Sequence, residues 1–180
     1  MYTFVTSFSE EGYNTYAKEM LQSIVDKWNP KHFKLYAYYH DFDIEKIDHP
    51  TSSSIVYIHL NDVKEMLDYR EKMKKHDGTE GGTMPYNWRL DAVKWYHKVY
   101  ALTDRAFKMM EENKNPEEPQ WLVWLDADTV TTKRLDKSAV DKWLPNKASL
   151  VHLGRKDVDY SETSFMGFNL QYHDACSILA

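Results

Sequence analysis

Cysteine is almost absent from this sequence, because Cys176 is the single cysteine in 180 residues. One thiol cannot form an intrachain disulfide or a cysteine-based zinc cluster, so both are excluded. Long hydrophobic runs are also lacking, and no stretch approaches the length of a membrane span. The first residues show no basic region followed by an apolar run, so no signal peptide is expected. These absences predict a reducing, cytoplasmic location and no integral membrane segment.

The sequence has fewer basic than acidic residues. The chain has 23 Lys and Arg against 28 Asp and Glu, which gives a formal net charge of −5. An acidic domain has no general attraction for phosphate backbones, so nucleic-acid binding is not favoured, although a local basic patch would still permit it. The sequence also lacks a GxxxxGK[ST] phosphate loop and HExxH spacing among its histidines. The chemistry of P-loop enzymes and zinc proteases is therefore not expected.

Aromatic residues, by contrast, are abundant at 14%, with 13 Tyr and 6 Trp. Such rings pack cores, and they also line sugar and base pockets because they combine flat apolar faces with polar edges. With 42% hydrophobic residues and no low-complexity tract, the chain is expected to fold. Its length fits one domain, so residues 1–180 are predicted to form a single domain.

Strand and helix patterns alternate along the chain. Short apolar or aromatic runs predict strands, and apolar residues at three- and four-residue steps predict helices. The expected strands are 2–8, 33–39, 55–60, 121–125, 149–153 and 164–170, and the expected helices are about 13–28, 61–75, 88–112, 136–144 and 171–179. This alternation predicts an α/β fold with a mostly parallel central sheet flanked by helices. Ligands are then expected beyond the carboxyl ends of the strands.

The long helix at 88–112 carries a predicted apolar stripe. Its members are Ala92, Tyr96, Val99, Thr103, Ala106 and Met110. The preceding segment, HDGTEGGTMPYN at 76–87, contains three glycines and a proline, so it is expected to be a flexible loop.

Two carboxylates, Asp126 and Asp128, directly follow the apolar run WLVWL. Negative charge beside a core strand costs free energy unless a cation compensates it. Mg²⁺ and Mn²⁺ prefer oxygen ligands and usually take one or two carboxylates plus substrate phosphates. The pair is therefore a candidate metal site, and the small Ala127 between the two acids is expected to leave room for a ligand.

The same spacing occurs at Asp41/Asp43 and at Asp157/Asp159, so a DxD triplet alone is not specific. The pair at 157/159 lies in a polar loop and is interpreted as a solvated turn. Only the pair at 126/128 follows a wholly apolar strand. For that pair the alternative is a strand-end turn in which an Asp caps a helix. The pattern by itself leaves metal binding and this alternative open.

WLVWLDADTV resembles the DxD segment of GT-A glycosyltransferases, in which a hydrophobic strand ends in metal-binding carboxylates. Four more segments are similar to this family in the same order along the chain: FVTSFSEEGYNTYAKEMLQSI, YAYYHD, NWRLDAVKWYHKVYAL and SETSFMGFNL. The resemblance implies a Rossmann-like GT-A fold and a metal-dependent glycosyltransferase. Such an enzyme moves a sugar from a nucleoside-diphosphate sugar to a hydroxyl-bearing acceptor, such as a polysaccharide or another glycan, with Mn²⁺ or Mg²⁺ as cofactor.

The resemblance also implies roles by position. Asp128 would ligate the metal directly, and Asp126 would contact the metal or the ribose and share in catalysis. The nucleotide-sugar would contact residues at strand ends and on the helix before the DxD strand, namely Thr6, Ser7, Asp41, Arg89, Lys98 and Asp126. For Arg89 and Lys98 the alternative is a solvated helix face.

Two residues nearer the C-terminus complete the predicted site. Glu162 is the candidate base, because inversion at the anomeric carbon requires a carboxylate to take the proton of the acceptor hydroxyl. A retaining enzyme would not need it in that role, and the alternative is a loop acid that only hydrogen-bonds substrate. His173 is the candidate third metal ligand by resemblance, and its alternative is a surface residue of a helix.

GT-A folds usually continue beyond the strand that matches SFMGFNL, so the expected fold is C-terminally shortened, and a minimal version, a truncated one and one completed by a partner all stay open. Two other functions stay open. A nucleotidyltransferase or phosphatase also sets carboxylates at strand ends, although the glycine-rich phosphate loop that it needs is not found. A non-catalytic carbohydrate- or nucleotide-binding module on the same fold would need no turnover. In an enzyme, GTEGG at 78–82 or the loop at 154–163 is expected to close over the sugar.

Overall fold

The computed structural model describes residues 1–113, 119–154 and 162–179, without the side chain of Glu162. A six-stranded sheet has the order β3-β2-β1-β4-β6-β5. The strands are β1 (Tyr2–Ser9), β2 (Phe33–His40), β3 (Ile55–His59), β4 (Trp121–Leu125), β5 (Leu150–Leu153) and β6 (Glu162–Asn169). The first four run parallel, while β6 is antiparallel to both β4 and β5. The predicted α/β class with a mostly parallel sheet is confirmed.

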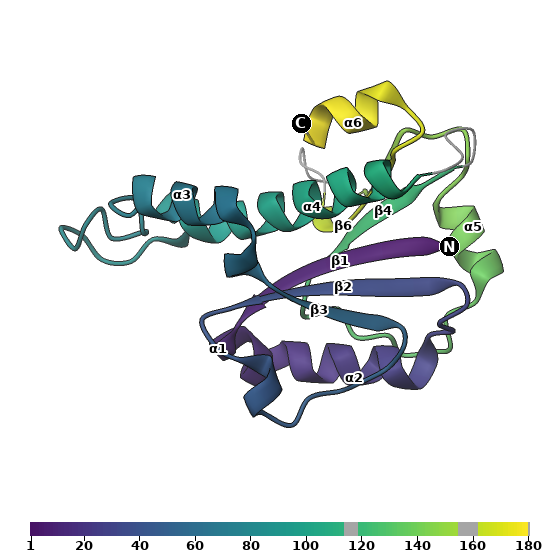
Figure 1. Cartoon of the computed structure of the whole chain (residues 1–180), viewed down its shortest axis with the longest axis horizontal. Coiled ribbons are helices and arrows are strands. Elements are labelled where there is room, and N and C mark those ends of the chain that lie inside the picture. The colour runs from purple at the N-terminus through teal and green to yellow at the C-terminus, as the bar shows by residue number, and fades with distance from the viewer. Residues whose placement is uncertain (114–118, 155–161, 180) are drawn as a thin grey trace.

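Helices cover both faces of the sheet (Figure 1). One face carries α1 (Glu10–Gly12), a π-helical turn (Tyr13–Ala17), α2 (Lys18–Lys27) and α5 (Lys137–Trp143), and the other carries α3 (Lys64–Lys72), α4 (Ala92–Glu112) and α6 (His173–Leu179). Short 3₁₀ turns lie at Ile44–Lys46, Leu60–Asp62 and Trp88–Leu90. β2 and β4 flank β1 on opposite sides, and right-handed crossovers then put α2 and α4 on opposite faces. Across the described ranges, every helix falls short of the length and apolarity that crossing a bilayer demands.

The sheet separates two apolar layers. The layer on the α2 side includes Phe4, Phe8, Met20, Leu21, Ile24 and Leu35, and the layer on the α4 side includes Val5, Tyr38, Leu102, Ala106, Leu122 and Trp124. Alternate residues of β1 and β4 contribute to the two layers, because successive side chains of a strand point to opposite faces. All five residues of β4 are buried, as predicted for WLVWL. Both layers extend to the end of β4, which Asp126 directly follows.

The apolar stripe predicted for the long helix is partly wrong. The buried residues of α4 are His97, Ala101, Leu102, Arg105, Ala106 and Met109. Tyr96 and Val99 of the predicted stripe are 37% and 46% exposed. The helix can turn Arg105 toward the sheet because its guanidinium lies 4.0 Å from the ring centroid of Tyr36 and pairs with Glu112. Burial of a cation is tolerated when such partners are present.

Residues 73–91, called the arm below, project with α3 and the start of α4 beyond the carboxyl ends of the strands (Figure 1). Backbone hydrogen bonds join the arm to itself and to α4, from Asn87 N–H to Gly78 O at 2.6 Å and from Ala92 N–H to His76 O at 3.0 Å. Asp91 caps α4 by accepting from Lys94 N–H at 2.8 Å, so the helix begins at residue 92, later than predicted.

Candidate active site

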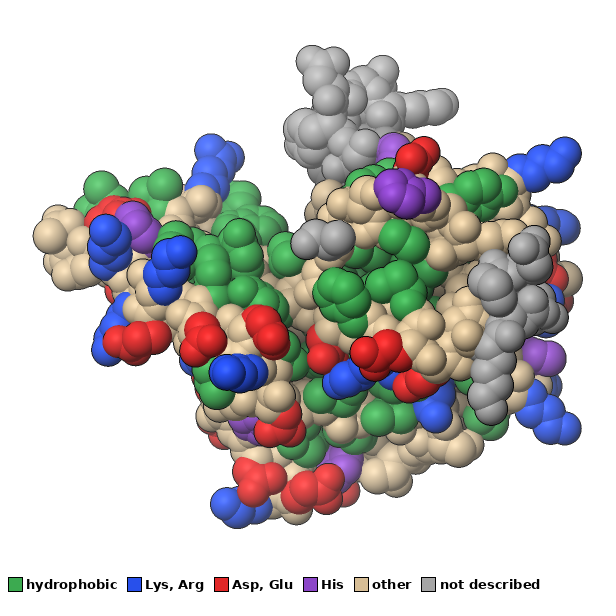
Figure 2. Space-filling model, turned by 45° about the horizontal axis from the view of Figure 1, so that its top comes forward, with side chains coloured by type: hydrophobic (Ala, Val, Ile, Leu, Met, Phe, Trp, Pro, Cys, Tyr) green, Lys and Arg blue, Asp and Glu red, His purple; other side chains and the backbone are tan. Residues whose placement is uncertain are grey.

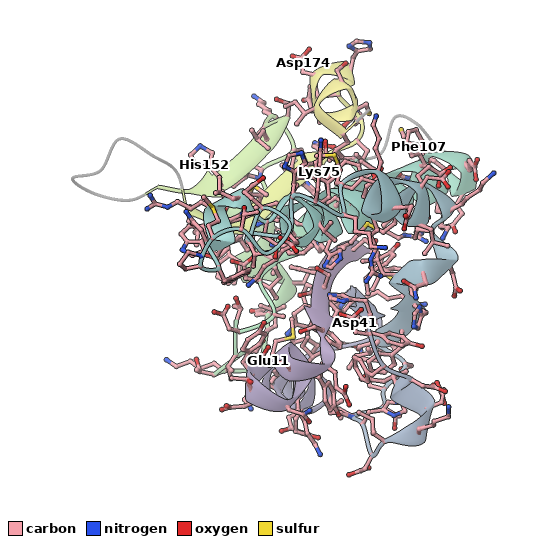
Figure 3. The ribbon with its side chains drawn as sticks, turned by 90° about the vertical axis from the view of Figure 1, so that its left-hand side faces the viewer. Glu11, Asp41, Lys75, Phe107, His152 and Asp174 are labelled. Atoms are coloured by element: carbon pink, nitrogen blue, oxygen red, sulfur yellow. The ribbon has the colours of Figure 1, made fainter. Side chains whose placement is uncertain are left out.

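A cavity of about 980 Å³ opens at the carboxyl ends of β1, β2 and β4. β1 is the strand at which the sheet order reverses, since β2 lies on one side of it and β4 on the other. Such a switch point leaves a crevice in which ligands of α/β proteins bind. Figure 3 looks at this end of the sheet, where Asp41 marks the end of β2 beneath the helical layer. The arm and the first turns of α4 form one wall of the cavity.

Asp126 follows the last residue of β4, and its backbone N–H donates to Ser164 O of β6 at 2.9 Å. Its Oδ1 accepts from Lys98 Nζ at 3.3 Å and from Trp124 Nε1. The carboxylate is therefore compensated in part by a cation that the protein supplies. The next residue, Ala127, is buried in the core layer on the α2 side, and the cavity lining does not include it.

Lys98 reaches from α4 to the ends of β4 and β6. Its Nζ donates to Thr163 O at 2.7 Å and lies 4.7 Å from the ring centroid of Trp124. Burial lowers the pKa of Lys98, and the nearby carboxylate of Asp126 opposes that shift. The Lys98 side chain is 17% exposed. A partly desolvated ammonium at the cavity wall attracts phosphate oxygens more strongly than one in bulk water.

A second charged group lies at the end of β2. Asp41 has a φ of 71°, and its Oδ1 accepts from Arg70 Nη2 at 3.1 Å while its Oδ2 contacts His40 Nδ1. Burial acts to raise the pKa of Asp41, but His40 and Arg70 outweigh it and hold this pKa below its usual value. Arg70 comes from α3, so this ion pair connects the helical side of the cavity to the sheet.

Two buried histidines form part of the cavity lining. The rings of His40 and His97 lie with centroids 3.9 Å apart, and the residues are 7% and 8% exposed. Burial lowers the pKa of His97 to about 3 and lowers that of His40 as well, so both are neutral near pH 7. Among the described residues, His97 Nε2 has no hydrogen-bond partner. The two rings therefore form a buried, uncharged part of the lining, and this Nε2 is itself enclosed.

The structure brings four of the predicted residues to the cavity, namely Ser7, Asp41, Lys98 and Asp126. Thr6 is fully buried, and strand alternation puts it on the opposite face of β1 from Ser7. Asp128 is exposed and lies outside the cavity lining. Arg89 is also exposed, with its guanidinium 5.3 Å from the Trp88 ring centroid on the arm.

The two remaining candidates, His173 and Glu162, lie nearer the C-terminus. His173 begins α6 and lines a separate cavity of about 200 Å³ together with Phe107. Phe107 is nine residues beyond Lys98 on α4, which corresponds to about 13 Å of helix. Glu162 begins β6 beside the cavity-lining Thr163, but its side chain lies outside the described residues, as do Asp157 and Asp159.

Sequence reasoning missed several residues that line the cavity: His40, Arg70, Tyr86, Trp88, Trp95 and His97. The position of His40, beside Asp41 at the end of a predicted strand, was a signal that could have found it. The others depend on which way α3, α4 and the arm face, and that orientation is set by packing.

The chain's sequence matches no known protein family and no curated protein. Its structure, however, is similar to mouse xyloside xylosyltransferase 1 in its apo form, with a TM-score of 0.52 at 12% identity over 99% of this chain and 71% of that chain. The chain has a GT-A-like glycosyltransferase fold. The Rossmann-like GT-A fold that the resemblance implied is thereby confirmed.

Two other solved structures are also similar to this GT-A-like chain. Glycosyltransferase GlyE of Streptococcus pneumoniae has a TM-score of 0.49 at 11% identity, over 99% of this chain and 36% of that chain. Galactosyltransferase LgtC, in complex with donor and acceptor sugar analogs, has a TM-score of 0.48 at 12% identity, over 94% of this chain and 58% of that chain. At these identities the similarity concerns the fold alone.

The GT-A resemblance implies a divalent cation, and the cavity can be tested for its ligands. Among the described residues, no group of three or more His, Cys, Asp or Glu is arranged to hold a metal. Mg²⁺ commonly uses only one or two carboxylates and completes its shell with water and substrate phosphates. Asp126 is one carboxylate of the cavity lining, and its contacts with Lys98 and Trp124 both involve Oδ1. A cation at Asp126 would thus have one protein carboxylate and would depend on a diphosphate and water for its remaining ligands.

Proposed function

We propose that this protein is a metal-dependent glycosyltransferase that moves a sugar from a nucleoside-diphosphate sugar to a hydroxyl group. The observation that supports this most is the pairing of Asp126 with Lys98 in the cavity beyond the parallel strand ends. One carboxylate that can share a cation and one ammonium that can bind phosphate are the charges that a diphosphate leaving group requires. The GT-A-like fold supports the same reaction.

Glycosyl transfer is limited by departure of the diphosphate while positive charge grows on the anomeric carbon. A divalent cation, when bound, supplies Lewis-acid stabilisation of that leaving group. Lys98 is placed to bind a phosphate oxygen, and Arg70 and Lys94 add positive charge to the same lining. Preorganised charge of this kind lowers a barrier by several kcal/mol where water is partly excluded.

The nucleoside is assigned to the ends of β1 and β2. Ser7 offers a hydroxyl group, Asp41 an ionised carboxylate, and the neutral rings of His40 and His97 offer flat faces with polar edges. A base and a ribose need this combination of apolar area and a few fixed polar groups.

The remaining roles stay predictions. We keep Glu162 as the residue that takes the acceptor proton in an inverting transfer, because Thr163 beside it lines the cavity. Roles for Thr6, Arg89, Asp128 and His173 would require ligand-induced movement, since the structure places all four outside the cavity lining.

The test is isothermal titration of UDP, GDP and TDP, and of their sugars, with and without Mn²⁺. We expect Mn²⁺-dependent binding of one nucleotide, which Asp126→Asn weakens at least tenfold, about 1.4 kcal/mol. Asp174→Asn on α6 is the matched control, since Figure 3 shows Asp174 on the far side of the helical layer from Asp41. Absence of Mn²⁺-dependent binding of all these compounds would refute the proposal.

Two further outcomes separate the alternatives. Release of pyrophosphate from a nucleoside triphosphate would identify a nucleotidyltransferase. Tight nucleotide-sugar binding with neither hydrolysis nor transfer would identify a non-catalytic module. Slow hydrolysis of a nucleotide-sugar that Asp126→Asn abolishes, with the fold intact by circular dichroism, would support the transferase.

A further inference from the structure

An aromatic surface lies on the wall of the cavity opposite the strand ends. Tyr86, Trp88 and Trp95 are 55%, 50% and 47% exposed, and all three line the same cavity as Lys98 and Asp126. Figure 2 shows hydrophobic side chains gathered over the projecting end of the molecule, where Figure 1 places α3 and the start of α4. Exposed aromatic side chains that gather on one wall of a cavity favour a binding surface over a solvated face.

These rings are held in place. Trp95 Nε1 donates to Trp88 O at 3.0 Å, and the two ring centroids are 5.5 Å apart with an angle of 49° between the planes. Tyr86 OH donates to Asp91 Oδ2 at 3.2 Å. Gly78 allows the Tyr86 ring to pack close, because a Cβ there would stand 2.7 Å from Tyr86 Cε2. The surface is therefore formed before a ligand arrives, which reduces the entropy lost on binding.

Acidic side chains line the cavity together with the three aromatic rings. Asp77, Asp91 and Glu71 line the same cavity as the rings, together with the cations Arg70, Lys74 and Lys94. Hydrogen bonds from the Thr79 hydroxyl and N–H keep the pKa of Asp77 below its usual value, so this acid is ionised near pH 7. Ionised carboxylates accept hydrogen bonds from hydroxyl groups and repel phosphates.

We propose that Tyr86, Trp88 and Trp95 form the acceptor subsite and that the acceptor is a carbohydrate. The inference rests on the proposed function and names its second substrate. A pyranose has one C–H face that stacks on an aromatic ring, and its hydroxyl groups can donate to Asp77 and Asp91. The cavity of about 980 Å³ lies at the upper end of ligand-pocket volumes, so it holds a donor and a sugar together.

Other occupants fit the surface less well. The diphosphate of a donor is attracted to Lys98 at the strand ends. Around the arm the cations Lys74 and Lys94 line the cavity together with Asp77 and Asp91, so the aromatic rings, more than charge, favour a sugar there. An apolar protein segment would remove water from Asp77 and Asp91 and add no donors to those that Thr79, Tyr86 and Lys94 N–H already supply, and such desolvation of charge is costly. A carbohydrate offers C–H faces that stack on the rings and hydroxyl groups that donate to the acids.

The test is saturation-transfer-difference NMR with four sugars, namely cellobiose, lactose, maltose and xylobiose. We expect transfer to the ring C–H protons of at least one sugar, and at least tenfold weaker binding in Trp88→Ala. Trp95→Phe keeps a ring and should bind more tightly than Trp95→Ala. The matched control is Phe107→Ala, because Phe107 is 51% exposed on the same helix as Trp95 but lines the separate cavity near α6.

Several outcomes overturn the inference. No transfer to any of the four sugars would do so, as would equal losses in Trp88→Ala and Phe107→Ala. A wild-type dimer that Trp88→Ala converts to a monomer, measured by light scattering, would identify a self-association surface instead. Should Trp88→Ala fail to fold by circular dichroism, Trp88→Leu keeps the apolar bulk and removes the aromatic face.

Failure of this inference is distinguishable from failure of the proposed function. Sugar binding to a wild-type protein that binds no nucleoside diphosphate leaves the aromatic subsite standing and refutes the transferase. Mn²⁺-dependent nucleotide binding with no sugar binding supports the transferase and refutes the aromatic subsite.

Discussion

Replacing Lys98 by methionine should destabilise the protein through the contacts that its ammonium makes. Met keeps most of the apolar stem against Trp124 but removes the donor that serves Thr163 O at 2.7 Å and Asp126 Oδ1 at 3.3 Å. The Lys98 and Asp126 side chains are 17% and 37% exposed, so the pair lies between the surface and the interior. Surface pairs contribute about 0.2–1 kcal/mol, and breaking a buried pair costs about 3–5 kcal/mol.

We therefore expect Lys98→Met to lower the free energy of unfolding by about 2 kcal/mol, which is a fall in Tm of about 4–8 °C for a chain of this size. Differential scanning fluorimetry measures it. Lys108→Met is the matched control on the same helix, because Lys108 pairs with Asp104 at 2.8 Å but is 46% exposed. That exposed pair should contribute no more than about 0.5 kcal/mol.

A double-mutant cycle completes the argument. Asp126→Asn in the Lys98→Met background should cost less than Asp126→Asn in the wild type, because its main partner is already absent. A coupling free energy below about 0.3 kcal/mol would refute the claim that Asp126 depends on Lys98, since independent sites add to within that margin.

Two more predictions concern the histidine pair and the arm. Burial lowers the pKa of His97 from 6.5 to about 3, so between these values the unfolded chain binds a proton that the folded chain does not, and stability falls as pH falls below 6.5. The free energy of unfolding should fall by at most about 1.4 kcal/mol per pH unit. Between pH 7 and pH 5, the Tm of the wild type should therefore drop by several degrees more than the Tm of His97→Gln. Equal drops in the two proteins would contradict this. Gly78→Ala should lower Tm more than Gly81→Ala, because both have positive φ, of 81° and 69°, but only the Cβ at 78 would meet Tyr86 and Asn87. Thermal scans of both variants measure it, and a Gly78→Ala protein no less stable than Gly81→Ala would argue against the fixed position of the Tyr86 ring.

Much of the fold could be predicted because apolar runs in this chain are short and sharply bounded. The run at 121–125 coincides with β4, and those at 2–8 and 33–39 differ from β1 and β2 by one residue. Strand ends were also predictable, and with them the positions of Asp126 and Asp41 beside the crevice. The order of the strands in the sheet was not predicted, because the apolar runs do not say which strands pair.

The cavity wall was harder to predict because it depends on how α4 is rotated. A count of apolar residues favoured Tyr96 and Val99 as inward positions, yet the inward residues include His97 and Arg105. Their burial depends on partners from distant segments, such as His40 and Tyr36, and no local pattern contains those partners. The aromatic residues of the arm were missed for the same reason, since their exposure is known only once the helix faces are fixed.

The ion pair between Arg70 and Asp41 joins α3 to the end of β2. Asp41 sits in the left-handed backbone region, where a side chain other than glycine is strained by about 1 kcal/mol or more. If a nucleoside binds beside Asp41 as proposed, it contacts the residue to which α3 is anchored, and α3 leads directly into the arm with its tryptophans. Both proposed binding regions would then depend on this one ion pair.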